Sequence, residues 1–188
     1  EAHWQVCSML QTGVWADAAF ASIGAVLLLA VSFPVLVWPQ GRHFAAYLRS
    51  GAPLAAALGL WWAAVCLISG DPRPLSYVPV LNPLDLAQAL VLASAAVWGR
   101  QVVRSGLPKS PAFGRFLPSV LAGWGFAWLN VVVVRAVHFL GEVPYASVPM
   151  FRSVVLQSAL AVLWSLAALA AMIAGRRWGR RQAWLAGA

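Results

Sequence analysis

Charged residues are scarce in this chain of 188 residues. They make up 10% of the sequence, and only five are acidic, whereas about 25% of a soluble globular domain is charged. Hydrophobic residues account for 62%. This balance excludes an ordinary water-soluble domain, and it excludes intrinsic disorder, which requires low hydrophobicity and high charge. The remaining fold class is an all-α polytopic transmembrane bundle.

Several kinds of functional site are also missing from the sequence. The two cysteines, Cys7 and Cys66, form no CxxC pair, and the three histidines are too scattered for a paired-haem arrangement. The sequence contains neither a glycine-rich phosphate loop nor a GxSxG nucleophile elbow. We therefore expect no metal and no cofactor, and the residues alone do not identify a reaction.

The net charge of +8 allows two interpretations. A basic protein can bind nucleic acid, or its arginines can mark the cytoplasmic loops of a membrane protein. The second interpretation is favoured because the basic residues form short runs between apolar blocks, so we expect no nucleic-acid partner. Only Lys109 is a lysine, and this preference for arginine, together with abundant alanine, indicates a bacterial genome rich in G and C.

Long apolar runs predict five membrane spans and the start of a sixth near Ala183. The third run has a clear helix start, with Asn82 as N-cap, Pro83 at the first helical position and Asp85 in the first turn. Pro34 predicts a kink late in the first span. The five predicted spans are residues 18–38, 53–69, 83–98, 117–140 and 153–174.

The two ends of the chain predict that it is a single transmembrane segment of a larger membrane protein. It begins at Glu1 without a signal-peptide pattern, and too few residues follow Ala183 to complete a span of roughly 20 residues. We therefore expect its partners to be membrane lipids and the remaining spans of the same polypeptide.

The basic residues also predict the orientation in the membrane. Ten of the thirteen lie in the first connecting segment, in the third, and in the segment after the fifth span, while the other connecting segments carry three of the five acids. By the positive-inside rule, the N-terminal end is outside and the C-terminal end is cytoplasmic, in a bacterial inner membrane. The ten residues are Arg42, Arg49, Arg100, Arg104, Lys109, Arg115, Arg176, Arg177, Arg180 and Arg181.

Arg135 is the most informative residue of the sequence, because charged side chains inside membrane spans are rare and usually face the protein interior or water. The fourth span runs outward in this topology, so Arg135 and His138 lie near its outer end. Asp85 begins the third span on the same outer side and is the expected ion-pair partner of Arg135. Together with Asn130 and Gln157, these residues form a predicted outer-face polar cluster.

Each residue of this cluster also has a purely structural interpretation. Arg135 can form a structural ion pair or reach the outer lipid headgroups, and Asp85 can act only on the helix dipole. His138 is either a general base or pH sensor, or a hydrogen-bonding residue at the interface. Asn130 is expected to hydrogen-bond between helices. The sequence leaves these alternatives open.

Eleven tryptophans are many for this length. Those near predicted span ends fit an aromatic belt at the interface, and those inside spans either fill the core or line a groove for a lipid or sugar. The first group is Trp15, Trp38, Trp98 and Trp178, and the second is Trp61, Trp62, Trp124, Trp128 and Trp164. Two proline-rich outer loops, residues 70–79 and 141–149, are either a rigid lid over an outward cleft or compact connectors.

Three stretches of the chain carry polar residues within otherwise apolar helices. The first is Tyr77–Gln88, and the second joins Trp128–Asn130 to Arg135, Val137 and His138. The third consists of Gln157–Leu160, Leu163–Leu166 and Gly175–Arg177. In this order, over about residues 77–188, they resemble a family of large bacterial membrane proteins catalogued as domain of unknown function 2339. The resemblance implies one slice of a many-span inner-membrane protein, and it supplies no activity, cofactor or catalytic residue.

Two hypotheses about function follow from the predicted cluster. In the first, the chain is a non-enzymatic module, a scaffold or part of a transport or envelope-assembly system, and the cluster is its buried polar network. In the second, it is an envelope enzyme acting on a lipid-linked or glycan substrate at the outer, periplasmic face, with His138 or Asp85 as acid–base and Arg135 holding an anionic group. A transporter with Arg135 along its path would be supported by internal repeats, which the sequence does not show.

Overall fold

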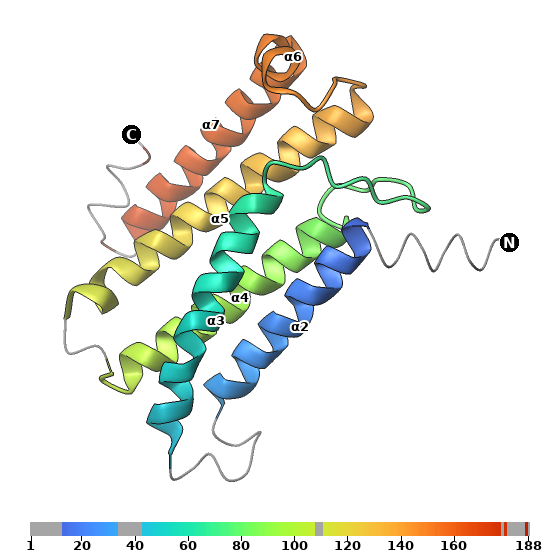
Figure 1. Ribbon diagram of the computed structural model, residues 1–188. Coiled ribbons are helices and arrows are strands. Elements are labelled where there is room, and N and C mark those ends of the chain that lie inside the picture. The colour runs from blue at the N-terminus through green and yellow to red at the C-terminus, as the bar shows by residue number, and fades with distance from the viewer. Residues whose placement is uncertain (1–12, 34–42, 108–110, 178, 180–186, 188) are drawn as a thin grey trace, which may run out of the picture. The chain divides into compact units, whose positions relative to one another are not determined.

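The computed structural model describes residues 13–33, 43–107, 111–177, 179 and 187 (Figure 1). Every regular element within these residues is a helix, so the all-α fold class is confirmed. The six helices are α2 (Val14–Ser32), α3 (Phe44–Val65), α4 (Pro83–Arg104), α5 (Pro111–Leu140), α6 (Ser147–Arg152) and α7 (Val154–Arg177).

Each of the five predicted spans overlaps one of the five long helices. Four of these helices, α2, α4, α5 and α7, are long and apolar enough to cross a membrane. The fifth, α3, has the length but is less apolar, since it contains Arg49 and Ser50. The predicted kink at Pro34 and the predicted sixth span near Ala183 lie outside the described residues.

Two helices begin before the predicted spans, which start at residues 53 and 117. Helix α3 begins at Phe44 and α5 at Pro111, so that Pro53 and Pro118 lie inside these helices. Proline removes one main-chain donor from a helix, but membrane proteins tolerate it where neighbouring groups bind the carbonyl that is released. A proline in an apolar run is therefore a weak signal for the start of a membrane helix.

The chain divides into two compact units, Glu1–Val132 and Val133–Ala188, and the division falls within α5. In the first unit α2, α3 and α4 form the core, and α2 packs most extensively on α4. Helix α2 faces this core with Ala18, Ala21, Ala25 and Leu28, a stripe at three- and four-residue spacing. Small side chains along such a stripe let two helix backbones approach closely in lipid.

The first part of α5 joins this core through its aromatic and apolar side chains. The Trp124 ring stacks on Trp62 of α3, with ring centroids 5.6 Å apart and planes within 4° of parallel. Gly59 makes room for this contact, because a Cβ at that position would lie 3.0 Å from the Trp124 ring. Of the two tryptophans, which the sequence assigned to core or groove, Trp62 is buried in the core of the first unit, and the half-buried Trp124 stacks on it.

The two ends of the first unit differ in chemistry. Helices α2 and α4 run in one direction and α3 runs in the other (Figure 1). The segment between α3 and α4, residues 66–82, therefore lies at the end where α2 begins. Arg49 near the start of α3, and Arg100 and Arg104 near the end of α4, lie at the opposite end. Within this unit these three arginines thus lie at the end opposite the 66–82 segment, whose own Arg73 is paired with Asp71.

The second unit has a small core of its own. Val137 at the end of α5, Met150 of α6 and Leu156 of α7 are buried together. Helix α6 has six residues and lies where the sequence predicted only a connecting segment. Apart from Leu156 and Gly175, the side chains of α7 are exposed or half-buried.

Candidate functional site

The N-terminal end of α4 is the most polar buried region of the first unit. Asn82 is its N-cap, and the side-chain carbonyl of Asn82 accepts a 3.0 Å hydrogen bond from the main-chain N–H of Leu84. Pro83 occupies the first helical position and Asp85 the first turn, so the predicted helix start is confirmed. The cap satisfies an N–H group that would otherwise be unpaired at a buried helix end.

Buried polar residues continue from this cap along α4. Asn82, Asp85, Gln88 and Ser94 each have at most 1% of their surface exposed. The Gln88 amide donates to the main-chain carbonyl of Trp62 at 3.4 Å and reaches the Cys66 sulfur at the same distance. Four buried polar side chains on one membrane helix are costly unless they are hydrogen-bonded. Gln88 therefore depends on partners in neighbouring elements, whereas the Ser94 hydroxyl donates to the carbonyl of Val91 in its own helix.

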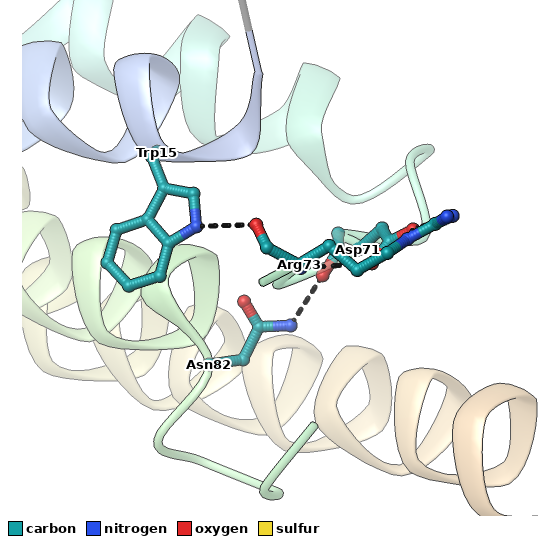
Figure 2. Close-up of polar contacts among 5 residues, drawn as sticks. Trp15, Asp71, Arg73 and Asn82 are labelled. Carbon is teal, nitrogen blue, oxygen red and sulfur yellow. Dashed lines mark hydrogen bonds and ion pairs between the residues drawn. The ribbon is translucent and has the colours of Figure 1, made fainter. Parts of the chain in front are cut away.

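The 66–82 segment is attached to α2 and to α4 (Figure 2). The Asn82 side chain donates to the carbonyl of Gly70 at 2.7 Å, so one residue caps α4 and holds the start of this segment. From α2, the Trp15 indole donates to the carbonyl of Arg73 at 3.1 Å. The Tyr77 hydroxyl donates to the carbonyl of Val132 at 3.4 Å. These three contacts hold the segment against the helices of the first unit.

The charges of this segment neutralise each other. The Arg73 guanidinium donates to Asp71 through Nε at 2.6 Å and forms an ion pair with the same carboxylate. This hydrogen bond, and the attraction of the carboxylate, raise the pKa of Arg73 above its ordinary value. Arg73 therefore stays cationic at every physiological pH, and it points away from the helices (Figure 2).

Tryptophan indoles bind main-chain carbonyls of other elements at two further places in the first unit. Trp98 of α4 donates to Leu48 of α3 at 2.9 Å, and Trp128 of α5 donates to the carbonyl of Asp85 at 3.1 Å. Trp62 differs, because its buried indole nitrogen has no hydrogen-bond partner among the described residues. Together with Trp15, these contacts give the tryptophans a cross-linking role that the sequence did not predict.

Arg135 is completely buried, in the part of α5 that belongs to the second unit. His138, one turn further on, is half-buried, and its Nδ1 lies 2.7 Å from the carbonyl of Val143. Its ring also meets Tyr145 edge-on, with centroids 5.4 Å apart. The His138 imidazole thus attaches the connecting segment 141–146 to the end of α5.

The other two residues of the predicted cluster lie in more exposed positions. Asn130 is partly exposed, and its amide donates to the carbonyl of Phe126 in its own helix at 2.7 Å. Gln157 is exposed, and it donates to the carbonyl of Phe151 at 2.8 Å, across the corner between α6 and α7. Asp85 and Asn130 belong to the first unit, whereas Arg135, His138 and Gln157 belong to the second. The grouping of all five residues stays a prediction.

Sequence reasoning overlooked two site residues of the first unit, Gln88 and Tyr77. Gln88 follows Asp85 at the same three-residue step by which Asp85 follows Asn82, which places the three on one side of a helix. This spacing was the available signal. No sequence signal marked Tyr77, because its partner is a main-chain carbonyl far along the chain.

The described residues offer few groups for metal binding or acid–base catalysis. They contain no group of three His, Cys, Asp or Glu side chains that could hold a metal ion. Their acids are Asp17, Asp71, Asp85 and Glu142, of which only Asp85 is buried. What the first unit does contain is a set of donors directed at main-chain carbonyls.

Comparison with known proteins agrees with this all-helical, apolar architecture. The family described as "Predicted membrane protein (DUF2339)" matches residues 1–188, the whole chain. The chain belongs to this family of membrane proteins, and the resemblance expected from its motifs is confirmed. No curated protein and no solved structure matches the chain.

Proposed function

We propose that this chain is a structural module of a larger inner-membrane protein, serving as a scaffold or as part of a transport or envelope-assembly system. One observation carries the proposal. In the first unit, six side chains of α4 and its surroundings donate hydrogen bonds to main-chain carbonyls of other elements. The donors are Trp15, Tyr77, Asn82, Gln88, Trp98 and Trp128.

Donors used in this way support a structural role. A catalytic or binding site needs side chains whose polar atoms can reach a substrate. A buried donor already bound to a carbonyl would have to break that bond before it could act, which leaves a buried acceptor unpaired. In a membrane the same bonds fix helix positions, because apolar contact with lipid and apolar contact with protein are nearly equivalent.

The proposed location is the bacterial inner membrane, with the 66–82 segment outside and the basic ends of α3 and α4 in the cytoplasm. The support is the separation of Arg49, Arg100 and Arg104 from that segment within the first unit, together with the positive-inside rule.

The test compares protein level with phenotype in cells that make the full-length protein. Asp85→Ala and Arg135→Ala each truncate a fully buried charged side chain. A structural role predicts that the amount of membrane-inserted protein falls in step with envelope integrity, measured as survival in low osmolarity and in detergent. Arg152→Ala, at an exposed arginine, is the matched control and should change neither. Normal protein level with lost envelope integrity would contradict the proposal.

One observation favours the second function, an envelope enzyme at the periplasmic face. The contact between His138 Nδ1 and the Val143 carbonyl fixes the imidazole, and it favours the tautomer in which Nε2 carries the lone pair. A held imidazole of this kind is suited to act as a general base. His138→Gln separates the two functions. If the chain is an enzyme, this variant should reduce envelope integrity at unchanged protein level. If the chain is a structural module, envelope integrity should stay unchanged as long as the protein level does.

A further inference from the structure

The 66–82 segment presents large apolar side chains outward. Leu75 is 59% exposed, Leu81 is 64% exposed, and Leu67, just after α3, is 81% exposed. Val78 and Val80 are exposed as well. Apolar surface gathered in one short segment is unfavourable in water, and in monomeric soluble proteins it is rare. The question is therefore which environment these exposed apolar side chains face.

The exposure does not come from a loose chain. Asn82 and Trp15 hold the first part of the segment through the carbonyls of Gly70 and Arg73 (Figure 2). In the second part, the Leu81 N–H closes a turn onto the Val78 carbonyl at 3.1 Å. Val80, inside this turn, has a φ of 70°, which a β-branched residue adopts only where its surroundings impose it.

Part of the main chain of the segment does not require hydrogen bonds to water. Three of its residues are prolines and have no N–H group. Four of its carbonyls accept hydrogen bonds within the first unit. Main-chain groups that enter lipid must be satisfied within the protein, so both features reduce the cost of leaving water. The prolines are Pro72, Pro74 and Pro79, and the carbonyls are those of Gly70, Pro72, Arg73 and Val78.

The charges and aromatic residues of this end fit the lipid headgroup region. The only charged side chains of the segment are Asp71 and Arg73, which form an ion pair, so the segment carries no net charge. The Trp15 indole binds the segment directly, and tryptophan and tyrosine are enriched at the depth where headgroups meet acyl chains. Tyr77 lies within the segment itself.

Exposed apolar side chains continue from the helices into the segment. Leu60 of α3 is 74% exposed, and Leu86 of α4 is 47% exposed. The chain belongs to a family of membrane proteins, in which apolar helix surfaces of this kind meet lipid or neighbouring spans. We propose that residues 74–81 rest in the lipid interface, where Leu75, Val78 and Leu81 contact the outer part of the acyl chains. The inference holds for either of the functions above, because it concerns the bilayer alone.

Nitroxide labelling of single cysteines tests the inference. In a full-length protein whose native cysteines are replaced by alanine, labels are placed by Leu75→Cys, Val78→Cys and Leu81→Cys. The protein is reconstituted in vesicles of phosphatidylethanolamine and phosphatidylglycerol, with a water-soluble nickel chelate on both sides. Each label should collide more often with oxygen, which concentrates in lipid, than with the chelate. Ser105→Cys, at an exposed residue after α4, is the control and should favour the chelate several-fold.

Two results would overturn the inference. If the three labels favour the chelate as Ser105→Cys does, residues 74–81 stand in water. If the labels collide rarely with both reagents, protein covers this surface, either another segment of the polypeptide or a partner. Unchanged vesicle insertion and an unchanged helical signal by circular dichroism show that the variants are folded, which is expected because all three side chains are exposed.

Discussion

The indole nitrogen of Trp98 donates a 2.9 Å hydrogen bond to the main-chain carbonyl of Leu48, which joins α4 to α3. Gly51, one turn further along α3, leaves room for that ring, since a Cβ there would lie 2.6 Å from the same nitrogen. Pro53 has no N–H, so the carbonyl of Arg49, next to Leu48, lacks its helical donor. The indole therefore supports α3 where its own hydrogen-bond ladder is weakest.

Removal of the Trp98 donor should lower the stability of the first unit. Replacement of Trp98 by 3-benzothienylalanine keeps the two fused rings but exchanges the N–H for sulfur. We expect the free energy of unfolding to fall by about 1 kcal/mol, the usual contribution of one hydrogen bond. Unfolding by dodecyl sulfate in mixed micelles, followed by circular dichroism, measures the change.

The same replacement at Trp62 is the control. The Trp62 nitrogen is buried and has no hydrogen-bond partner among the described residues, so the loss of its N–H should leave stability unchanged or raise it slightly. Equal losses at Trp62 and Trp98 would show that the altered ring, and not the lost hydrogen bond, is responsible.

A methyl group at Gly51 should separate α3 from α4. In Gly51→Ala the new Cβ meets the Trp98 ring at 2.6 Å and Leu28 at 3.2 Å, so one of these side chains must move. Crowding of a packed core typically costs about 1–3 kcal/mol. The same unfolding assay measures it.

Gly123→Ala supplies the opposite case. A Cβ at Gly123 meets nothing within 4 Å, so alanine adds no clash there. It should stabilise α5 by up to about 1 kcal/mol, because alanine has the higher helix propensity. The tight contact between Gly51 and the Trp98 ring would be ruled out if both glycine variants gained stability.

Asn82 performs two tasks that substitution can separate. Serine keeps an oxygen for the Leu84 N–H but cannot reach the Gly70 carbonyl, whereas alanine loses both contacts. We expect Asn82→Ser to cost about 1 kcal/mol and Asn82→Ala about 2 kcal/mol. Hydrogen exchange of the first turn of α4 distinguishes the tasks, since only alanine should accelerate it. Equal exchange rates in the two variants would rule out the capping role.

The start of α4 shows what the sequence could predict. Asn82, Pro83 and Asp85 act through groups within four residues of themselves, so their pattern determines the cap wherever the helix packs. The presence of the long helices follows for a similar reason, because the bilayer requires about 20 apolar residues per span, although α3, α4 and α5 are longer than the predicted spans. The class of the protein was therefore readable from local features.

The partners of the tryptophans were not readable in the same way. Long apolar helices are hydrophobic all round, so the sequence reveals where they lie in the chain but not the face that meets a neighbour. Trp15 and Trp98 fit an aromatic belt by position, yet their indoles bind the carbonyls of Arg73 and Leu48. Every residue has a carbonyl, so no pattern marks the one that accepts. Helix α6 was missed because six residues that include Pro149 show no helical period.

Asp85 and Arg135 are each fully buried, which makes the ion pair predicted from the sequence testable by a double-mutant cycle. Asp85→Leu and Arg135→Met each replace a charged side chain by an apolar one. Removal of one member of a buried pair should cost about 3–5 kcal/mol, because the other charge stays buried. The double variant should recover a large part of that loss. Costs that simply add would mean that each residue has another partner, and Arg152→Met, at an exposed arginine, should cost under about 0.5 kcal/mol.

The orientation is tested by thiol labelling in intact cells. Ser147 begins α6 and Ser105 follows α4, and both are exposed. With the arginine-rich ends inside, Ser147→Cys should react with a membrane-impermeant maleimide in intact cells. Ser105→Cys should react only after the inner membrane is permeabilised, and a variant without cysteine measures the background. Labelling of Ser105→Cys in intact cells would place the basic ends of α3 and α4 outside, and the proposed topology would be reversed.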